Sequence, residues 1–182
     1  MRDLGHIEAV YLIGIGGIGM SALARYFAVQ GKTVAGYDRT QTELTKELES
    51  SGISIHYSDS TDEISDTFKN PENTLVIYTP AVKALNELAY FQANKFEVLK
   101  RSEVLGALSR SYNTVAVAGT HGKTTTSSIV AHLLKSSSQD CNAFLGGISS
   151  NYNTNLLTST SSNLMVVEAD EFDRSFLTLT PN

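Results

Sequence analysis

The stretch VYLIGIGGIGMSALARYFAVQ, residues 10–30, contains an apolar run, a glycine-rich turn and an amphipathic run in direct succession. Val10–Ile15 has the length and apolar character of a buried strand, and Met20–Gln30 carries apolar residues at helical spacing. Between them, Gly14–Gly19 matches G-x-G-x-x-G, a pattern that binds a diphosphate at a strand–helix junction. The stretch therefore predicts a Rossmann-like α/β domain built on a parallel sheet.

The glycines of this loop have separate predicted roles. Gly14 permits the tight turn, Gly16 lets backbone N–H groups approach a pyrophosphate, and Gly19 lets the helix pack close to the strand. The helix that follows presents its positive N-terminal end to the phosphates. Asp38 ends the second apolar run, where an acid can bind a ribose hydroxyl. The pattern predicts a nucleoside-diphosphate site without deciding between NAD and a UDP-sugar, which share these groups.

Strand-like and helix-like runs continue to alternate beyond this stretch, which is typical of a parallel sheet with crossover helices. The further predicted strands are Thr33–Tyr37, Ile53–His56, Leu75–Tyr78 and Val98–Leu99, and the further helices are Thr42–Ser50, Leu85–Asn94 and Arg101–Ser109. Together they predict a five-strand domain over residues 1–108.

Residues 109–182 begin a second α/β unit. It has an apolar strand at Thr114–Ala118, a helix at Lys123–Ser136 and another strand at Leu164–Val167. Residues 136–163 are rich in Ser, Asn, Thr and Gly, which predicts mostly loop around a short segment at Ala143–Leu145. Because two strands and one helix cannot bury a core, we expect only the beginning of a P-loop-type α/β ATPase domain.

A second glycine loop, AGTHGKTTT at residues 118–126, again follows a strand and opens a helix. It departs from G-x-x-x-x-G-K-[ST] in its first glycine, where Val117 stands. Lys123 would bring a positive charge to the β- and γ-phosphate oxygens, and Thr124 would ligate Mg²⁺. The residues expected to bind ATP are Gly119, Thr120, Gly122, Lys123, Thr124 and Thr125.

An acidic residue ends the last apolar strand. Because the carboxyl ends of parallel strands share one edge, Glu168 should reach a metal bound to Thr124. Asp170, Glu171 and Asp173 follow at once, and each is as readily a solvated residue as a ligand. A dehydrogenase has no use for a triphosphate loop, so the two loops together predict phosphoryl transfer onto a nucleotide-linked substrate.

Composition narrows the class of protein. The formal net charge of −5 argues against a nucleic-acid partner, and no run of eighteen apolar residues could insert into a membrane. The start, MRDLGHIEAVYL, lacks the form of a signal peptide. The single cysteine, Cys141, excludes an intrachain disulfide and is expected to be a buried thiol in a cytoplasmic protein. The oligomeric state is left open.

Three segments resemble the Mur ligase family: GIGGIGMSALA (14–24), AGTHGKTTTS (118–127) and EADEFDRSFL (168–177). The resemblance implies a three-domain ligase of peptidoglycan synthesis with ATP and Mg²⁺ as cofactors. His121 and the first loop are similar to the branch that joins L-alanine to the lactyl carboxylate of UDP-N-acetylmuramate through an acyl phosphate. A second branch, which recycles murein tripeptide, shares the GTHGKTTT loop and stays an alternative.

The resemblance also implies the roles of individual residues. Those expected to bind the UDP-sugar are Gly14, Gly16, Gly17, Ile18, Gly19, Asp38 and Thr79, and those expected to be catalytic are Lys123, Glu168 and His121. The metal would lie on Thr124 and Glu168. Residues 151–155 and 170–174 would lie near the sugar and the lactyl group. This sequence departs from the family at Asp59, where many members have His, so the uracil contact is open.

Two other functions remain possible at this point. An NAD-dependent oxidoreductase would explain Gly14–Gly19 and Asp38, but would leave Gly119–Thr124 without a function. A UDP-sugar-binding module is compatible with the ligase, because these 182 residues would bind ligands without turnover if most of the ATPase core and the third domain lie elsewhere.

Overall fold

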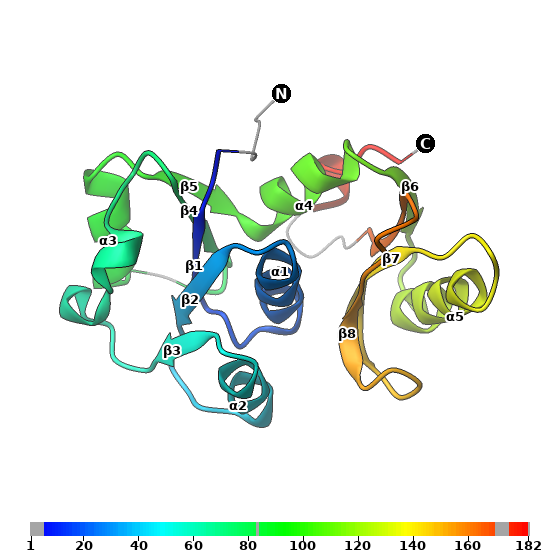
Figure 1. The fold of residues 1–182 in the computed structure, drawn as a ribbon, viewed down its shortest axis with the longest axis horizontal. Helices are drawn as coiled ribbons and strands as arrows, with labels where there is room; N and C mark the ends of the chain where they lie inside the picture. The colour runs from blue at the N-terminus through cyan, green and yellow to red at the C-terminus, as the bar shows by residue number, and fades with distance from the viewer. Residues whose placement is uncertain (1–5, 83, 170–174, 182) are drawn as a thin grey trace. The chain divides into compact units, whose positions relative to one another are not determined.

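The computed structural model describes residues 6–82, 84–169 and 175–181. The chain divides into two compact units, Met1–Arg101 and Ser102–Asn182. Both have α/β architecture, as the sequence predicts (Figure 1). None of the described helices is both long and apolar enough to cross a lipid bilayer.

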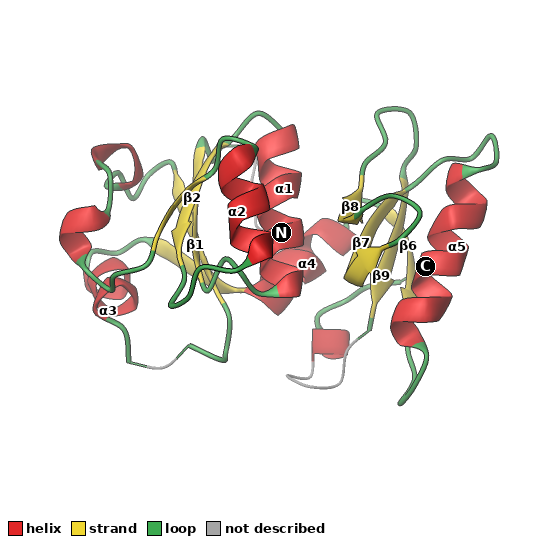
Figure 2. Cartoon of the chain, turned by 90° about the horizontal axis from the view of Figure 1, so that it is seen from below, coloured by secondary structure: helices red, strands yellow, loops and turns green. Residues whose placement is uncertain are grey.

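Unit 1 is a five-stranded parallel sheet with the strand order β3-β2-β1-β4-β5. Helices α1 and α2 cover one face of this sheet and α3 lies on the other (Figures 1 and 2). The elements are β1 (Ala9–Ile13), α1 (Ile18–Val29), β2 (Thr33–Tyr37), α2 (Glu43–Ser50), β3 (Ser54–His56), β4 (Thr74–Tyr78), α3 (Asn86–Ala93) and β5 (Glu97–Lys100). The predicted five-strand Rossmann-like domain is confirmed.

The apolar runs that predict the strands are the centre of the core. All five residues of β1 are buried, because the strand has sheet neighbours on both sides and helices on both faces. Tyr11 extends from β1 into an aromatic cluster with Phe68 and Phe91, with ring centroids 5.6 and 5.0 Å away. Burial of this kind is the main stabilising contribution to the sheet.

Unit 2 begins earlier than the expected boundary after Leu108. Helix α4 (Arg101–Ser109) packs within this unit, because the Thr178 hydroxyl donates to the Ser102 carbonyl at 2.8 Å. A side chain at Gly106 would collide with the backbone of Thr178. These contacts connect α4 to a segment that is distant in sequence, a link that helical periodicity does not indicate.

Residues 136–163 contain more strand than expected, because the short segment predicted at Ala143–Leu145 is part of the longer β7 and because β8 was not predicted. The four-stranded sheet of unit 2 has the order β6-β9-β7-β8, with β7 and β8 forming an antiparallel pair beside parallel neighbours. Its elements are β6 (Asn113–Val117), α5 (Lys123–Lys135), β7 (Asn142–Ser149), β8 (Thr154–Leu157) and β9 (Leu164–Glu168). The polar and glycine residues that suggested a loop lie in strands because β9 offers β7 a buried neighbour.

Unit 2 has its own small core, between α5 and the sheet (Figure 2). It contains Ala131, Cys141, Ala143, Leu145, Leu157 and Val166. The core contains more apolar side chains than the two predicted strands and one helix could bury, because β7 and β8 contribute Ala143, Leu145 and Leu157.

We expect the thiol of Cys141 to be inert toward thiol reagents in the folded chain. The side chain is fully buried, its Sγ lies 3.6 Å from the Ala131 carbonyl, and burial raises the pKa of the thiol. Labelling should be on the order of 100-fold slower than in the urea-unfolded chain. Ellman's reagent can test this without ambiguity, since the chain has one cysteine. Native labelling at the unfolded rate would contradict the packing of α5 on β7.

Candidate functional site

The first glycine loop joins β1 to α1 at the carboxyl edge of the unit 1 sheet. The N–H groups of Gly14 and Ile15 donate to the Tyr37 carbonyl, at 2.8 and 3.1 Å. Gly14 has a φ of +84°, and a Cβ there would lie 2.6 Å from Cγ2 of Thr79. The position therefore needs glycine both for its backbone conformation and for its contact with Thr79.

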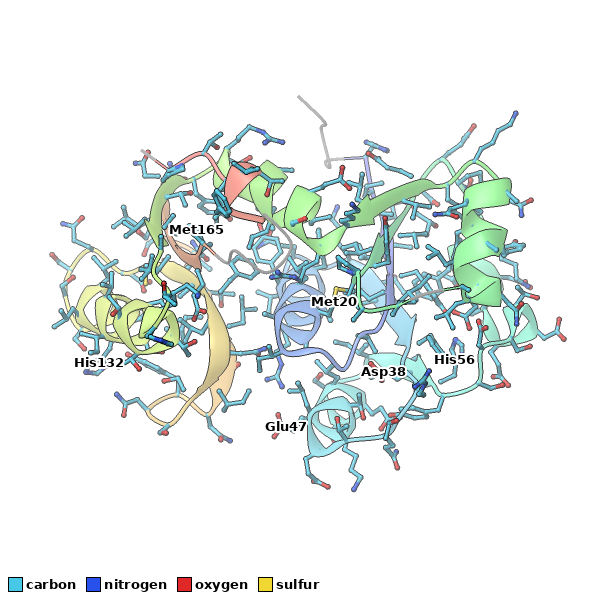
Figure 3. The ribbon with its side chains drawn as sticks, turned by 180° about the vertical axis from the view of Figure 1, so that it is seen from behind. Met20, Asp38, Glu47, His56, His132 and Met165 are labelled. Atoms are coloured by element: carbon cyan, nitrogen blue, oxygen red, sulfur yellow. The ribbon has the colours of Figure 1, made fainter. Side chains whose placement is uncertain are left out.

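Asp38 stabilises this loop from the end of β2. Its Oδ2 accepts the N–H of Gly16 at 2.7 Å, and its Oδ1 accepts the N–H of Thr40 at 3.3 Å. A Cβ on Gly16 would lie 2.8 Å from Cγ2 of Thr45, on α2. The absence of a side chain at Gly16 thus lets α2 and Asp38 pack against the loop. The G-x-G-x-x-G pattern does not predict this packing role. Figure 3 labels Asp38 beside His56, which ends the neighbouring strand β3.

A positively charged side chain, Arg101, lies against the start of α1, and the glycine motif does not indicate it. A Cβ on Gly19 would lie 2.9 Å from Nη1 of Arg101, so the guanidinium lies against the first turn of the helix. Gly19 was expected to allow close packing on a strand, but its nearest neighbour is this side chain. Gly17 has no atom within 3.4 Å of its Cβ position, and Ile18 is 38% exposed. Arg101 is thus a further candidate for binding a diphosphate.

Asp59, whose role at the uracil was open, caps a helix. Its two carboxylate oxygens accept the N–H groups of Asn86 and Glu87 in the first turn of α3, at 2.9 and 3.1 Å. A carboxylate in this position also interacts favourably with the helix dipole. The fold therefore gives Asp59 a structural role at the start of α3.

A buried polar network lies next to this cap. The Tyr11 hydroxyl donates to Oε2 of Glu87 at 2.7 Å, and the Nε2 of His56 contacts both groups, lying 3.3 Å from Oε1 of Glu87. The side chain of Glu87 is 0% exposed, and burial raises its pKa to about 7. Burial lowers the pKa of His56. Tyr11 and His56 also line a cavity of about 610 Å³, whose lining residues do not include Gly14–Gly19.

The second glycine loop joins β6 to α5 in unit 2. Gly119 and Gly122 have φ values of +144° and +79°, which L side chains rarely adopt. The Nζ of Lys123 donates to the Gly119 carbonyl at 2.8 Å, so the ammonium lies over the loop. The other predicted ATP contacts, Thr120, Thr124 and Thr125, are exposed, and so is His121, which was predicted to be catalytic. The loop therefore presents glycines, hydroxyls and a cation to solvent.

Glu168 meets this loop as the sequence predicts. It ends β9 opposite Val117 of β6, and its Oε2 accepts the hydroxyl of Thr124 at 3.2 Å. Its Oε1 accepts the Ser127 hydroxyl at 3.0 Å and the Gly146 N–H at 2.8 Å. Sequence reasoning missed both of these residues. Ser127 lies one helical turn after Thr124, which is a usable signal, whereas nothing in the sequence places Gly146 there.

The residues around Glu168 fit a site for a divalent cation that also binds the phosphates of a nucleotide. Among the described residues, no three His, Cys, Asp or Glu side chains gather as a metal site. One carboxylate and one hydroxyl are, however, what Mg²⁺ takes from a protein when phosphates and water supply its other ligands. The groups that donate to Glu168, two hydroxyls and a backbone N–H, are neutral, so its negative charge is available to a cation.

Asp170, Glu171, Asp173 and Arg174 lie outside the described residues. Of the segment 151–155, Asn151 and Asn153 are exposed, whereas Asn155 is buried in β8.

Sequence comparison gives the family context. Residues 9–113 match the Mur ligase family, catalytic domain. A protein from Parabacteroides distasonis, named UDP-N-acetylmuramate–L-alanine ligase, is 58% identical over 180 residues, covering 98% of this chain and 39% of that protein. A protein of the same name from Cytophaga hutchinsonii is 52% identical, covering 99% of this chain and 40% of its own length. The chain thus spans about 40% of the length of these relatives.

Solved structures agree with this context. The crystal structure of UDP-N-acetylmuramate-alanine ligase from Thermotoga maritima superposes with a TM-score of 0.85 at 34% identity, covering 96% of this chain and 40% of that chain. A ligase from Neisseria meningitides named for UDP-N-acetylmuramate and L-alanyl-γ-D-glutamyl-meso-diaminopimelate has a TM-score of 0.84 at 24% identity, covering 96% of this chain and 58% of its own. That second likeness shows the fold.

Proposed function

The chain belongs to the Mur ligase family, and from this premise we propose that it carries nucleotide-binding machinery of an ATP-dependent ligase. The proposed reaction joins L-alanine to the lactyl carboxylate of UDP-N-acetylmuramate, as the names of relatives with 52 and 58% identity suggest. The proposed setting is peptidoglycan precursor synthesis in the cytoplasm.

The observation that carries the proposal is the meeting of Thr124 and Glu168 at a second phosphate-type loop. A dehydrogenase would use Gly14–Gly19 and leave this arrangement without a function. A tripeptide-recycling ligase would use both loops, and it is disfavoured because the more similar relatives are named for L-alanine.

The proposed chemistry has two balanced steps. A lactyl carboxylate oxygen attacks the γ-phosphorus of ATP, giving an acyl phosphate and ADP. The amine of L-alanine then attacks the acyl carbon, phosphate leaves, and the amine loses a proton as the amide forms. Lys123 would offset the charge on the transferred phosphoryl group, and Thr124 and Glu168 would hold Mg²⁺. When bound, Mg²⁺ supplies further charge stabilisation to the phosphate oxygens.

Other residues of the chain would bind and orient the substrates. The N-terminus of α1, with Arg101 against it, would hold the UDP pyrophosphate. The exposed position of His121 in the second loop is compatible with contact to phosphate or substrate. Because the chain spans about 40% of its relatives, we propose that these 182 residues bind ligands without turnover.

Calorimetric titration of this chain with UDP-N-acetylmuramate, and separately with NADH, tests the proposal. We expect binding of the UDP-sugar and none of NADH, because relatives with 52 and 58% identity are named for UDP-N-acetylmuramate. Binding of NADH alone would overturn the ligase assignment. If neither ligand bound, the claim that this chain contains a sufficient UDP-sugar site would be refuted. Amide formation by the 182-residue chain would contradict the absence of turnover.

A further inference from the structure

The two oxygens of Glu168 are held unequally. Oε1 accepts two hydrogen bonds, from the Ser127 hydroxyl at 3.0 Å and from the Gly146 N–H at 2.8 Å. Oε2 accepts one longer hydrogen bond, 3.2 Å, from the Thr124 hydroxyl. The carboxylate is therefore fixed through Oε1, while Oε2 is shared with a residue on the phosphate loop.

The groups that hold Oε1 belong to the interior of unit 2. Ser127 is 0% exposed, lies on α5 and also donates to the Thr124 carbonyl at 3.1 Å. Gly146 belongs to β7, and a Cβ there would fall on the carboxylate of Glu168. Gly147 allows a similar approach, since its Cβ position is 3.3 Å from Cγ2 of Thr124. Three elements thus converge on one carboxylate: α5, β7 and β9.

This arrangement has a consequence for metal binding. A carboxylate side chain that rotates freely loses conformational entropy when it binds a cation. A carboxylate whose Oε1 is already held by hydrogen bonds only has to exchange the hydrogen bond at Oε2 for the cation. We propose that Ser127 is a positioning residue that, with the N–H of Gly146, fixes Oε1 of Glu168 so that Oε2 and the Thr124 hydroxyl face a divalent cation together. The inference rests on the proposed function of the second loop.

The test compares the ATP affinity of the chain with Mn²⁺ present and with metal removed by chelation, both measured by calorimetry. The wild-type chain should bind ATP more tightly with Mn²⁺. In Ser127→Ala, this enhancement should fall about 10-fold, the usual cost of losing a group that orients a metal ligand. Metal-free ATP affinity should not change, because Ser127 touches Glu168 and the Thr124 carbonyl instead of the loop amides. A merely structural role would lower both affinities together.

Two further variants keep the result interpretable. Ser128→Ala, the next residue of α5 and half-buried, is the matched control and should retain the wild-type enhancement. Gly146→Ala displaces the same carboxylate from β7, so it should reduce the enhancement by a similar factor even if Ser127→Ala does not fold.

Failure of the positioning role of Ser127 and failure of the metal site would give different results. An enhancement that persists in both Ser127→Ala and Gly146→Ala would overturn the positioning role and leave the ATP site intact. A wild-type chain that binds ATP equally with and without Mn²⁺, or not at all, would overturn the metal site itself and the inference with it. Loss of the enhancement in Ser127→Ala but not in Ser128→Ala supports the proposal.

Discussion

Gly16→Val is expected to weaken binding of UDP-N-acetylmuramate by at least about 100-fold, or about 2.7 kcal/mol. The new Cβ would lie 2.8 Å from Cγ2 of Thr45 and 2.9 Å from Oδ2 of Asp38, so the loop must move. That movement breaks the hydrogen bond between the Gly16 N–H and Asp38 and shifts the amides at the start of α1. Two hydrogen bonds to a charged diphosphate account for a loss of this size. Calorimetric titration measures it.

The second unit provides an internal control for this variant. Gly16→Val changes unit 1, so ATP binding to the loop in unit 2 should be preserved. Ala28→Val adds bulk at an exposed position of the same helix and should bind the UDP-sugar as the wild type does. Wild-type affinity in Gly16→Val would show that the UDP-sugar does not use this loop.

Glu87→Gln is expected to change how the stability of unit 1 depends on pH. Burial raises the pKa of Glu87 from 4.5 to about 7, so the folded unit favours the protonated acid. Its stabilising contribution is complete below pH 4.5 and is lost as the pH rises toward 7. Gln keeps the shape and stays neutral. The free energy of unfolding of the variant, relative to that of the wild type, should therefore rise between pH 4.5 and pH 7, by on the order of 3 kcal/mol.

The difference between the two chains is the informative quantity, because His56 acts in the opposite direction. Burial lowers the pKa of His56, so its contribution is lost as the pH falls, in both chains. Urea unfolding followed by hydrogen exchange in β1 reports on unit 1 alone. Glu72→Gln, at an exposed position, is the matched control. A constant difference between Glu87→Gln and wild type would show that Glu87 does not titrate in this range.

Much of the fold can be predicted because its signals are local. The apolar runs of β1, β2 and β4 are buried by their own sheet, and both glycine loops lie at the strand–helix junctions where their patterns require them. Glu168 could be placed because parallel strands end at a common edge. The strands and glycine loops depend on spacing within one short segment, whereas Glu168 depends on a general rule of parallel sheets.

The features that were missed depend on contacts between distant segments. The β7–β8 hairpin mixes apolar residues with polar and glycine residues, so its sequence lacks a continuous strand pattern, and pairing with β9 makes it part of a sheet. The sequence leaves the role of Asp59 open, whereas the structure shows that it accepts two N–H groups of α3. Asp38 was expected to bind a ribose, and the structure gives it a backbone partner at Gly16. A contact with ribose remains a proposal.

The central position of β1 has a consequence for how the chain folds during synthesis. Ala9 pairs with Thr33 on one side and with Thr74 on the other, so β1 has a neighbour that is translated much later than β1 itself. Until β4 leaves the ribosome, β1 has one edge of unpaired N–H and C=O groups, and the entropy of closing a long loop opposes its pairing. We therefore expect this interval of synthesis to favour aggregation of the nascent chain.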